Sequence, residues 1–146
     1  MRIFALKEAT IISIHFMALI AAAGDKGINV KIVSELTNCS RNHLSKLMEK
    51  LIKANLVYAK RGQTGGFYLN RKAKEIHIID IIEAINGKIE KEDLCPGGKN
   101  ICKGQGYIFG NLCKEISQEF LEHISNKTLE DIKGKAEELL IKNGYK

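Results

Sequence analysis

The stretch CSRNHLSKLMEKLIKANLVYAKRGQTGGFYLN, residues 39–70, is the most informative part of this chain of 146 residues. Ser40 is a favourable N-cap residue, and the apolar residues that follow it recur at helical spacing. These residues are Leu44, Leu47, Met48, Leu51 and Ile52. They predict a helix with one buried stripe, and Asn55 can close that helix in a left-handed backbone conformation.

Two short strands are expected after this helix, at residues 56–59 and 67–69, because both segments carry the apolar and aromatic side chains that strands favour. Residues 60–66, KRGQTGG, connect the strands as a basic loop whose glycines allow a tight turn and a close approach to another backbone. A short helix over residues 30–36 precedes the stretch. Together these elements predict a helix-turn-helix followed by a wing.

Positive charge is concentrated in the same region. Residues 41–74 contain nine Lys or Arg residues and a single acid, Glu49, whereas a solvated helix face usually mixes both signs. This excess indicates a surface that binds the phosphates of nucleic acid. The net charge of +6 for the whole chain agrees with a polyanionic partner.

The N-terminal part of the chain contains an apolar run, residues 11–23, that ends in three alanines as a signal peptide can. Two polar residues, Glu8 and His15, argue against that interpretation, and the run is too short to span a bilayer. We therefore expect residues 5–23 to form a buried first helix that stops at Gly24. The protein is then expected in the cytoplasm, without membrane contact.

The rest of the chain divides into further helices around a glycine-rich segment. Residues 76–85 predict an isoleucine-rich helix that ends at Gly87, and Thr128 is expected to cap a last helix over 129–142. Between them, a long helix carries apolar residues every four positions, namely Leu112, Ile116, Phe120 and Ile124. An apolar stripe on such a helix needs a partner, and the usual partner is the same helix of a second subunit.

The expected fold is therefore mainly α with a small β-wing. The predicted units are a winged helix-turn-helix domain at 1–87, a cysteine-containing segment at 88–106, and a dimerisation helix with a C-terminal helix at 107–146. No enzyme motif is visible: the sequence has no nucleophile elbow or paired-carboxylate pattern, and its glycine-rich loop lacks the Lys-Ser/Thr of a nucleotide loop.

The sequence resembles the Rrf-type family of bacterial winged-helix regulators, which includes IscR, NsrR, RsrR and the cluster-free CymR. The matching segments are MRI at 1–3, LSKL at 44–47, LIKANLV at 51–57, RGQTGGFYL at 61–69, IIDIIEAI at 78–85 and TLEDI at 128–132. The resemblance implies a homodimer that binds operator DNA, with the long helices forming the dimer interface.

The resemblance also implies which residues meet DNA. The residues expected to face the major groove are Ser40, Arg41, His43, Ser45 and Lys46. The wing residues are Arg61, Gly62, Gln63, Thr64 and Gly65, with Arg61 entering a minor groove, where a weakly hydrated guanidinium is favoured. IscR-like members usually hold an acid at the position of Ser45, so the preferred base stays open.

Two cysteines, Cys95 and Cys102, lie in the glycine-rich segment, which has the freedom to wrap two thiolates around a metal centre. A lasting disulfide is disfavoured in a reducing cytoplasm. Zinc would need a further pair of Cys or His residues at short spacing. We therefore expect an iron–sulfur cluster, with 2Fe–2S favoured over 4Fe–4S.

The remaining cluster ligands are taken from the resemblance. RsrR-like members, whose pattern is the nearest, add a Glu and a His from the first helix of the partner subunit; Glu8 matches the Glu, but Ile12 stands in place of the His. His15 lies on the same helix face as Glu8, two turns or roughly 10 Å away. Three-cysteine members have their third Cys where Tyr107 stands, and Cys113 is interpreted as a packed thiol.

The fourth ligand stays open between His15, Tyr107 and Cys113. The function expected from this sequence is a homodimeric transcriptional regulator that senses redox state, iron supply or nitric oxide through its cluster. The alternative is a cluster-free regulator of the same fold that responds to a small molecule or a protein partner.

Overall fold

The computed structural model describes residues 6–63, 65–89 and 112–146, with side chains from residue 115 onward in the last range. Cys95, Cys102, Tyr107 and Thr64, together with the side chain of Cys113, lie outside these described residues. The expectations placed on these five residues therefore stay predictions.

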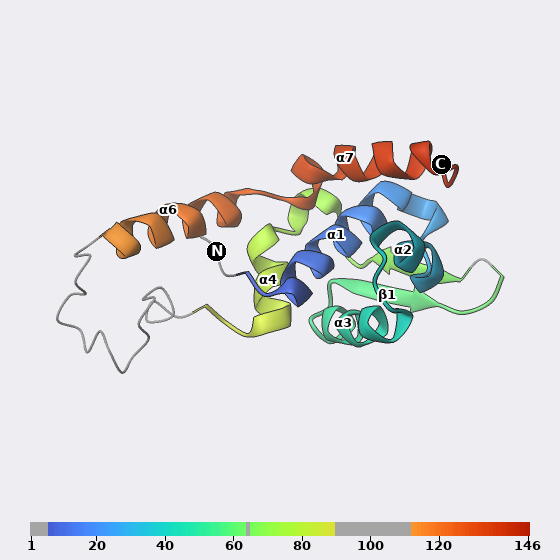
Figure 1. The fold of residues 1–146 in the computed structure, drawn as a ribbon, viewed down its shortest axis with the longest axis horizontal. Coiled ribbons are helices and arrows are strands. Elements are labelled where there is room, and N and C mark those ends of the chain that lie inside the picture. Colours follow the sequence, from blue (N-terminus) through green and yellow to red (C-terminus); the bar gives the residue numbers. More distant parts are fainter. Residues whose placement is uncertain (1–5, 64, 90–111) are drawn as a thin grey trace.

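Among the described residues the fold is mainly helical with one two-stranded antiparallel sheet, which confirms the expected fold class (Figure 1). In chain order the described elements are α1 (Glu8–Ala23), η1 (Gly24–Lys26), α2 (Val30–Thr37), α3 (Arg41–Lys53), β1 (Val57–Lys60), β2 (Gly66–Leu69), η2 (Ala73–Glu75), α4 (Ile78–Asn86), α6 (Leu112–Asn126) and α7 (Leu129–Lys142). The first helix ends at Gly24, as expected, because this glycine adopts a φ of +56° that other residues rarely take.

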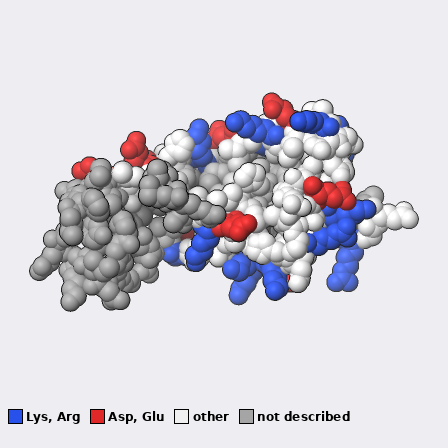
Figure 2. Space-filling view, viewed as in Figure 1, with Lys and Arg blue, Asp and Glu red and all other residues white. Residues whose placement is uncertain are grey.

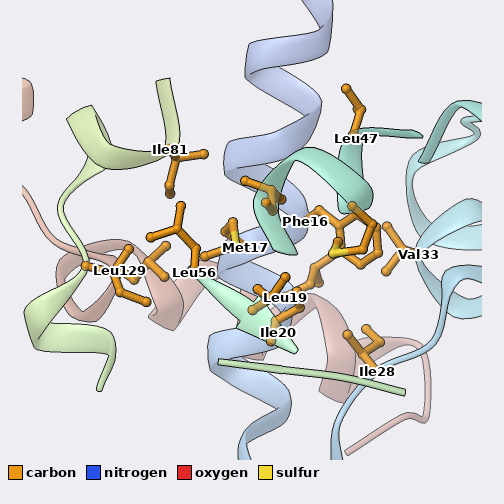
Figure 3. Packing of buried hydrophobic residues seen from close by; sticks show 14 of the residues in the cluster. Phe16, Met17, Leu19, Ile20, Ile28, Val33, Leu47, Leu56, Ile81 and Leu129 are labelled. Carbon is orange, nitrogen blue, oxygen red and sulfur yellow. The ribbon is translucent and has the colours of Figure 1, made fainter. Parts of the chain in front are cut away.

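Helix α1 forms the centre of the core and packs against α4, α7 and β2. Its residues Phe16, Met17 and Ile20 are almost completely buried, and Figure 3 shows them surrounded by side chains from the other elements. By length and composition alone, Glu8–Lys26 is apolar enough to cross a membrane, contrary to the expectation from the shorter run. Packing inside the core accounts for this apolar character.

Helix α3 begins as its sequence predicts, because the Ser40 hydroxyl oxygen accepts a hydrogen bond from the His43 N–H at 3.2 Å. Four residues of its apolar stripe are buried, namely Leu44, Leu47, Met48 and Leu51. The expectation for Ile52 was wrong, since its side chain is 41% exposed. At about 100° per residue, Ile52 lies roughly 90° from the middle of the stripe and so reaches the edge of the buried face.

The wing is formed by β1 and β2, which pair from Val57 with Leu69 to Lys60 with Gly66. It is joined to the connection between α1 and α2, because Ile28 and Phe67 exchange two main-chain hydrogen bonds of 3.3 and 2.8 Å. Asn55, with a φ of 59°, makes the left-handed turn into β1, as expected.

Two tyrosines support the base of the wing. The rings of Tyr58 and Tyr68 stack with centroids 5.5 Å apart, and the Lys60 ammonium lies 4.6 Å from the Tyr68 centroid. The Tyr68 ring also covers Gly27, where an added Cβ would come within 2.4 Å of the ring. Gly27 is therefore required for contact between the wing and the α1–α2 connection.

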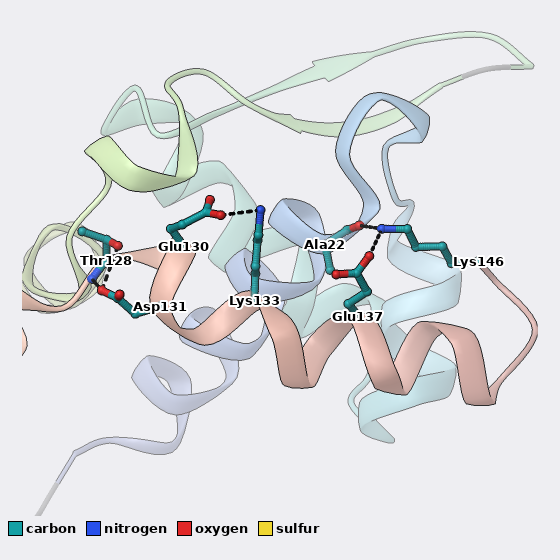
Figure 4. Close-up of polar contacts among 7 residues, drawn as sticks. All are labelled: Ala22, Thr128, Glu130, Asp131, Lys133, Glu137 and Lys146. Carbon is teal, nitrogen blue, oxygen red and sulfur yellow. Dashed lines mark hydrogen bonds and ion pairs between the residues drawn. The ribbon is translucent and has the colours of Figure 1, made fainter.

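Helix α7 folds back onto α1 of the same chain (Figure 4). At its first turn, the main-chain N–H and the hydroxyl of Thr128 both donate to the Asp131 carboxylate, at 2.8 and 2.9 Å. These two bonds, the main-chain bond first, hold the pKa of Asp131 below its usual range. Beyond its last turn, the Lys146 ammonium binds Glu137 and the carbonyl oxygen of Ala22.

Helix α6 projects from the compact unit (Figure 1). Its apolar stripe is divided between two environments: Ile116 is 42% exposed, Phe120 is partly buried against the core, and Ile124 is only 6% exposed. Ile124 was expected at the dimer interface, but it is buried within its own chain.

We predict that Gly27→Ala lowers the free energy of unfolding by about 1–3 kcal/mol, because the new methyl group meets Tyr68 and the φ of +66° is strained. Gly134→Ala is the matched control, since its position in α7 has no atom within 4 Å of an added Cβ. This change should raise stability by about 0.5–1 kcal/mol. Urea unfolding checks both values; equal effects would show that the Tyr68 contact does not constrain the wing.

Candidate functional site

The N-terminal half of α3 presents a polar, basic surface to solvent. Each residue that was expected to face the major groove is exposed, namely Ser40, Arg41, His43, Ser45 and Lys46. The Ser45 hydroxyl donates to the carbonyl oxygen of Arg41 at 2.8 Å, which leaves only its lone pairs for a base. Arg41, His43 and Lys46 thus provide the long side chains that could reach base edges or phosphates.

Figure 2 shows where charge lies on one face of the molecule. Lysine and arginine side chains gather along the lower edge of this view, where α3 lies in Figure 1. A duplex carries a dense row of phosphates, so a basic edge that includes an exposed helix is a suitable binding surface.

The tip of the wing is a tight turn with an exposed arginine. Gly62 adopts a φ of +108°, and the N–H of Gly65 donates to the Gly62 carbonyl oxygen at 2.9 Å. An added Cβ on Gly65 would lie 2.7 Å from two main-chain carbonyl oxygens, so the turn requires glycine there. Arg61 and Gln63 are exposed on this turn, which suits a groove contact.

Sequence analysis did not predict the contacts of Tyr58, Tyr68 and Gly27 that support the wing. Nothing in the sequence spacing indicates that Gly27 meets Tyr68, because that contact joins segments far apart along the chain. An aromatic pair at facing positions of two predicted strands was the available signal.

The two expected cluster ligands whose side chains are described, Glu8 and His15, both lie on α1. Glu8 is exposed in the first turn, and within the described ranges its carboxylate has no hydrogen-bond or ion-pair partner. The side chain of His15 places its Nδ1 2.8 Å from the carbonyl oxygen of Ile11, so that nitrogen is the donor and Nε2 is available as a ligand. The structure groups no three metal-ligating side chains among the residues that it describes.

His15 lies near residues that were not expected to be cluster ligands. It lines an apolar groove of about 510 Å³ between α1, the end of α2 and α7, together with Cys39. Cys39 is half-buried, with its Sγ 3.6 Å from the carbonyl oxygen of Thr37. Glu8 is not part of this groove, so the two candidate ligands on α1 face different surroundings.

The donor chemistry of the described residues is compatible with one end of an iron–sulfur site. Glu8 offers a carboxylate that has no partner among the described residues, and this hard oxygen ligand suits iron alongside thiolates. The thiolates themselves would come from the two cysteines that lie outside the described residues.

Solved structures that share this fold include CymR and IscR. CymR of B. subtilis superposes with a TM-score of 0.71 at 23% identity and covers 91% of this chain and 98% of its own. IscR of T. potens gives a TM-score of 0.71 at 23% identity and covers 92% of this chain and 90% of its own. The winged-helix architecture of this chain is therefore the one found in both proteins.

Sequence comparison identifies the family. The chain is similar to the transcriptional regulator NsrR of Oceanobacillus iheyensis, at 28% identity over 137 residues, 92% of this chain and 93% of the relative. It is also similar to IscR of Pectobacterium atrosepticum, at 27% identity over 100 residues, 68% of this chain and 60% of the relative. The family model Rrf2, described as an iron-dependent transcriptional regulator, matches residues 6–135. The chain therefore belongs to the Rrf2 family of transcriptional regulators, which are DNA-binding proteins and not enzymes.

Proposed function

We propose that this protein is a cytoplasmic, homodimeric regulator that reads operator DNA and senses redox state, iron supply or nitric oxide through a 2Fe–2S cluster. The observation that carries the DNA-binding part is the exposed basic half of α3 beside the Arg61 turn. The iron-dependent description of the family supports the sensor part.

For DNA recognition, α3 supplies the major-groove residues and the wing supplies a minor-groove contact. Arg41, His43 and Lys46 extend from the first two turns of α3, so they can reach into a groove that receives this end of the helix. The Arg61 guanidinium, next to Gly62 at the exposed tip of the wing, suits the narrow and strongly negative minor groove of A·T-rich DNA.

For sensing, Cys95 and Cys102 of one subunit and Glu8 of the other would hold the cluster. When bound, such a cluster supplies one-electron redox chemistry whose potential depends on its ligands. The carboxylate of Glu8 lies at the exposed start of α1, where a second subunit could bring its own thiolates. The fourth ligand is proposed among His15, Tyr107 and Cys113, in that order.

For assembly, the exposed part of the α6 stripe would form the subunit contact. Ile116 is the exposed apolar residue of this stripe among the described side chains, and Phe120 lies at its border with the core. Burial of such side chains against a partner is favourable by roughly 25 cal/mol per Å².

We predict that selection from random duplexes enriches a near-palindromic site whose half-sites lie about one helical turn apart, because a two-fold dimer presents two α3 helices. Arg61→Ala should weaken binding to this site more than Lys72→Ala, since Arg61 is placed in the groove. Fluorescence anisotropy measures both affinities. Selection without any enriched sequence would refute specific operator recognition.

We predict that anaerobic reconstitution yields a brown protein whose Cys95→Ala and Cys102→Ala variants lose iron and visible absorbance. Glu8→Ala should bind a labile cluster, and Cys39→Ala is the control that keeps a full one. A complete cluster in the Cys102→Ala variant would exclude the assignment, and a requirement for Cys113 would favour the three-cysteine pattern. A colourless wild-type protein would support the cluster-free alternative.

We predict that Ile116→Lys produces monomers in light scattering and lowers DNA affinity, because the new charge would lie in the subunit contact. Ile141→Lys is the control, since Ile141 is 56% exposed at the far end of α7. A dimeric Ile116→Lys variant would show that the interface lies elsewhere.

A further inference from the structure

The C-terminal end of α4 is held by side chains from two other helices. The Lys50 ammonium of α3 donates to the Ile85 carbonyl oxygen at 3.2 Å. The Asn86 side-chain amide donates to the hydroxyl oxygen of Thr10 in α1 at 2.8 Å. The adjacent residues Ile85 and Asn86 therefore connect α3 with α1.

Both bonds suit the chemistry of a helix end. The last carbonyl groups of a helix lack intrahelical partners and carry partial negative charge, so an ammonium group is favoured there. Thr10 is completely buried, and a buried hydroxyl is costly to leave unpaired. Both bonds therefore constrain the position of α4 relative to its neighbours.

Lys50 and Lys46 differ in what their ammonium groups contact among the described residues. Lys46 lies one turn earlier on the same helix, is exposed, and has no bonding partner within the described part of the chain. The Lys50 ammonium is instead directed at the main chain of α4. Lys50 is exposed as well, so what separates it from Lys46 is the hydrogen bond of its ammonium group to the carbonyl oxygen of Ile85 and not burial.

We propose that Lys50 is a positioning residue, and that Lys50–Ile85 and Asn86–Thr10 form a polar link that transmits the position of α1 to the recognition helix. Thr10 lies two residues after Glu8, on the first turns of α1. A displacement of this end of α1 thus reaches α3 through two hydrogen bonds and one peptide unit. The regulatory part of this proposal rests on the proposed function, in which Glu8 is a cluster ligand.

The chain beyond α4 is tied to the same junction. After Gly87, whose φ is +89°, the N–H of Ile89 donates to the Glu83 carboxylate at 3.2 Å. This hydrogen bond fixes residues 87–89 against the end of α4, next to the Lys50–Ile85 and Asn86–Thr10 contacts.

A salt series separates a positioning role from a phosphate contact. The probe is the duplex enriched by selection, and its association constant is measured by anisotropy at several salt concentrations. Lys50→Met should weaken binding about tenfold through loss of a charged hydrogen bond, with an unchanged slope of log K against log salt. Lys46→Met, the matched control, should reduce the magnitude of that slope by about 0.9 for each phosphate that the lysine neutralises.

Two further variants test the same link if the Lys50→Met variant does not fold. Asn86→Ala and Thr10→Val break the other half of the link without changing charge, and each should weaken binding without altering the slope. Lys50→Arg should retain most of the affinity. A reduced slope in Lys50→Met, or unchanged affinity in both Asn86→Ala and Thr10→Val, would overturn the proposal.

A second measurement tests transmission. We compare the DNA affinities of cluster-loaded and cluster-free protein, and we count iron in each sample. Thr10→Val should bind as much iron as wild type but bring the affinity ratio close to one. A full ratio in Thr10→Val would overturn the link. A wild-type ratio of one would instead refute the proposed sensing, while the salt series still decides the positioning role of Lys50.

Discussion

Burial of α1 is the constraint on which the rest of the structure depends. Its side chains Phe16, Met17 and Ile20 are almost completely buried, and the helix packs against α4, α7 and the wing strand β2. Because α1 contacts all of these elements, its position fixes the angles at which they meet. It also carries Glu8 and Thr10 at its start, so the central packing element reaches the proposed sensor surface.

The features that depend on local physics could be predicted from sequence. Ser40 as an N-cap, the left-handed Asn55 and the glycine turn of the wing each require only neighbouring residues, and each is present in the structure. The buried stripe of α3 was also correct except at Ile52. That residue lies at the border of the stripe, where the shape of neighbouring elements, not periodicity, determines exposure.

The features that depend on distant parts of the chain could not be predicted in the same way. Periodicity shows that α6 has an apolar face, but it does not show that Ile124 is covered by its own chain while Ile116 remains exposed. A count of basic residues likewise includes Lys50, whose ammonium binds α4. For the sensor, residue types and spacing indicated candidate ligands. Of these ligands, the structure describes the side chains of Glu8 and His15 only, and His15 lines the groove between α1 and α7 whereas Glu8 does not.

The hydrogen bonds between Ile28 and Phe67 have a further consequence for regulation. They join the wing to the connection that leads into α2, so each chain carries α3 and the wing, the two elements proposed to contact DNA, in one packed body. In the proposed dimer these bodies act as tethered ligands, and the second one binds at a high effective concentration. Such bivalence raises avidity by about 10²–10⁴-fold and disappears when geometry prevents simultaneous binding. A slight reorientation between subunits can therefore release the operator while every contact within each body stays intact.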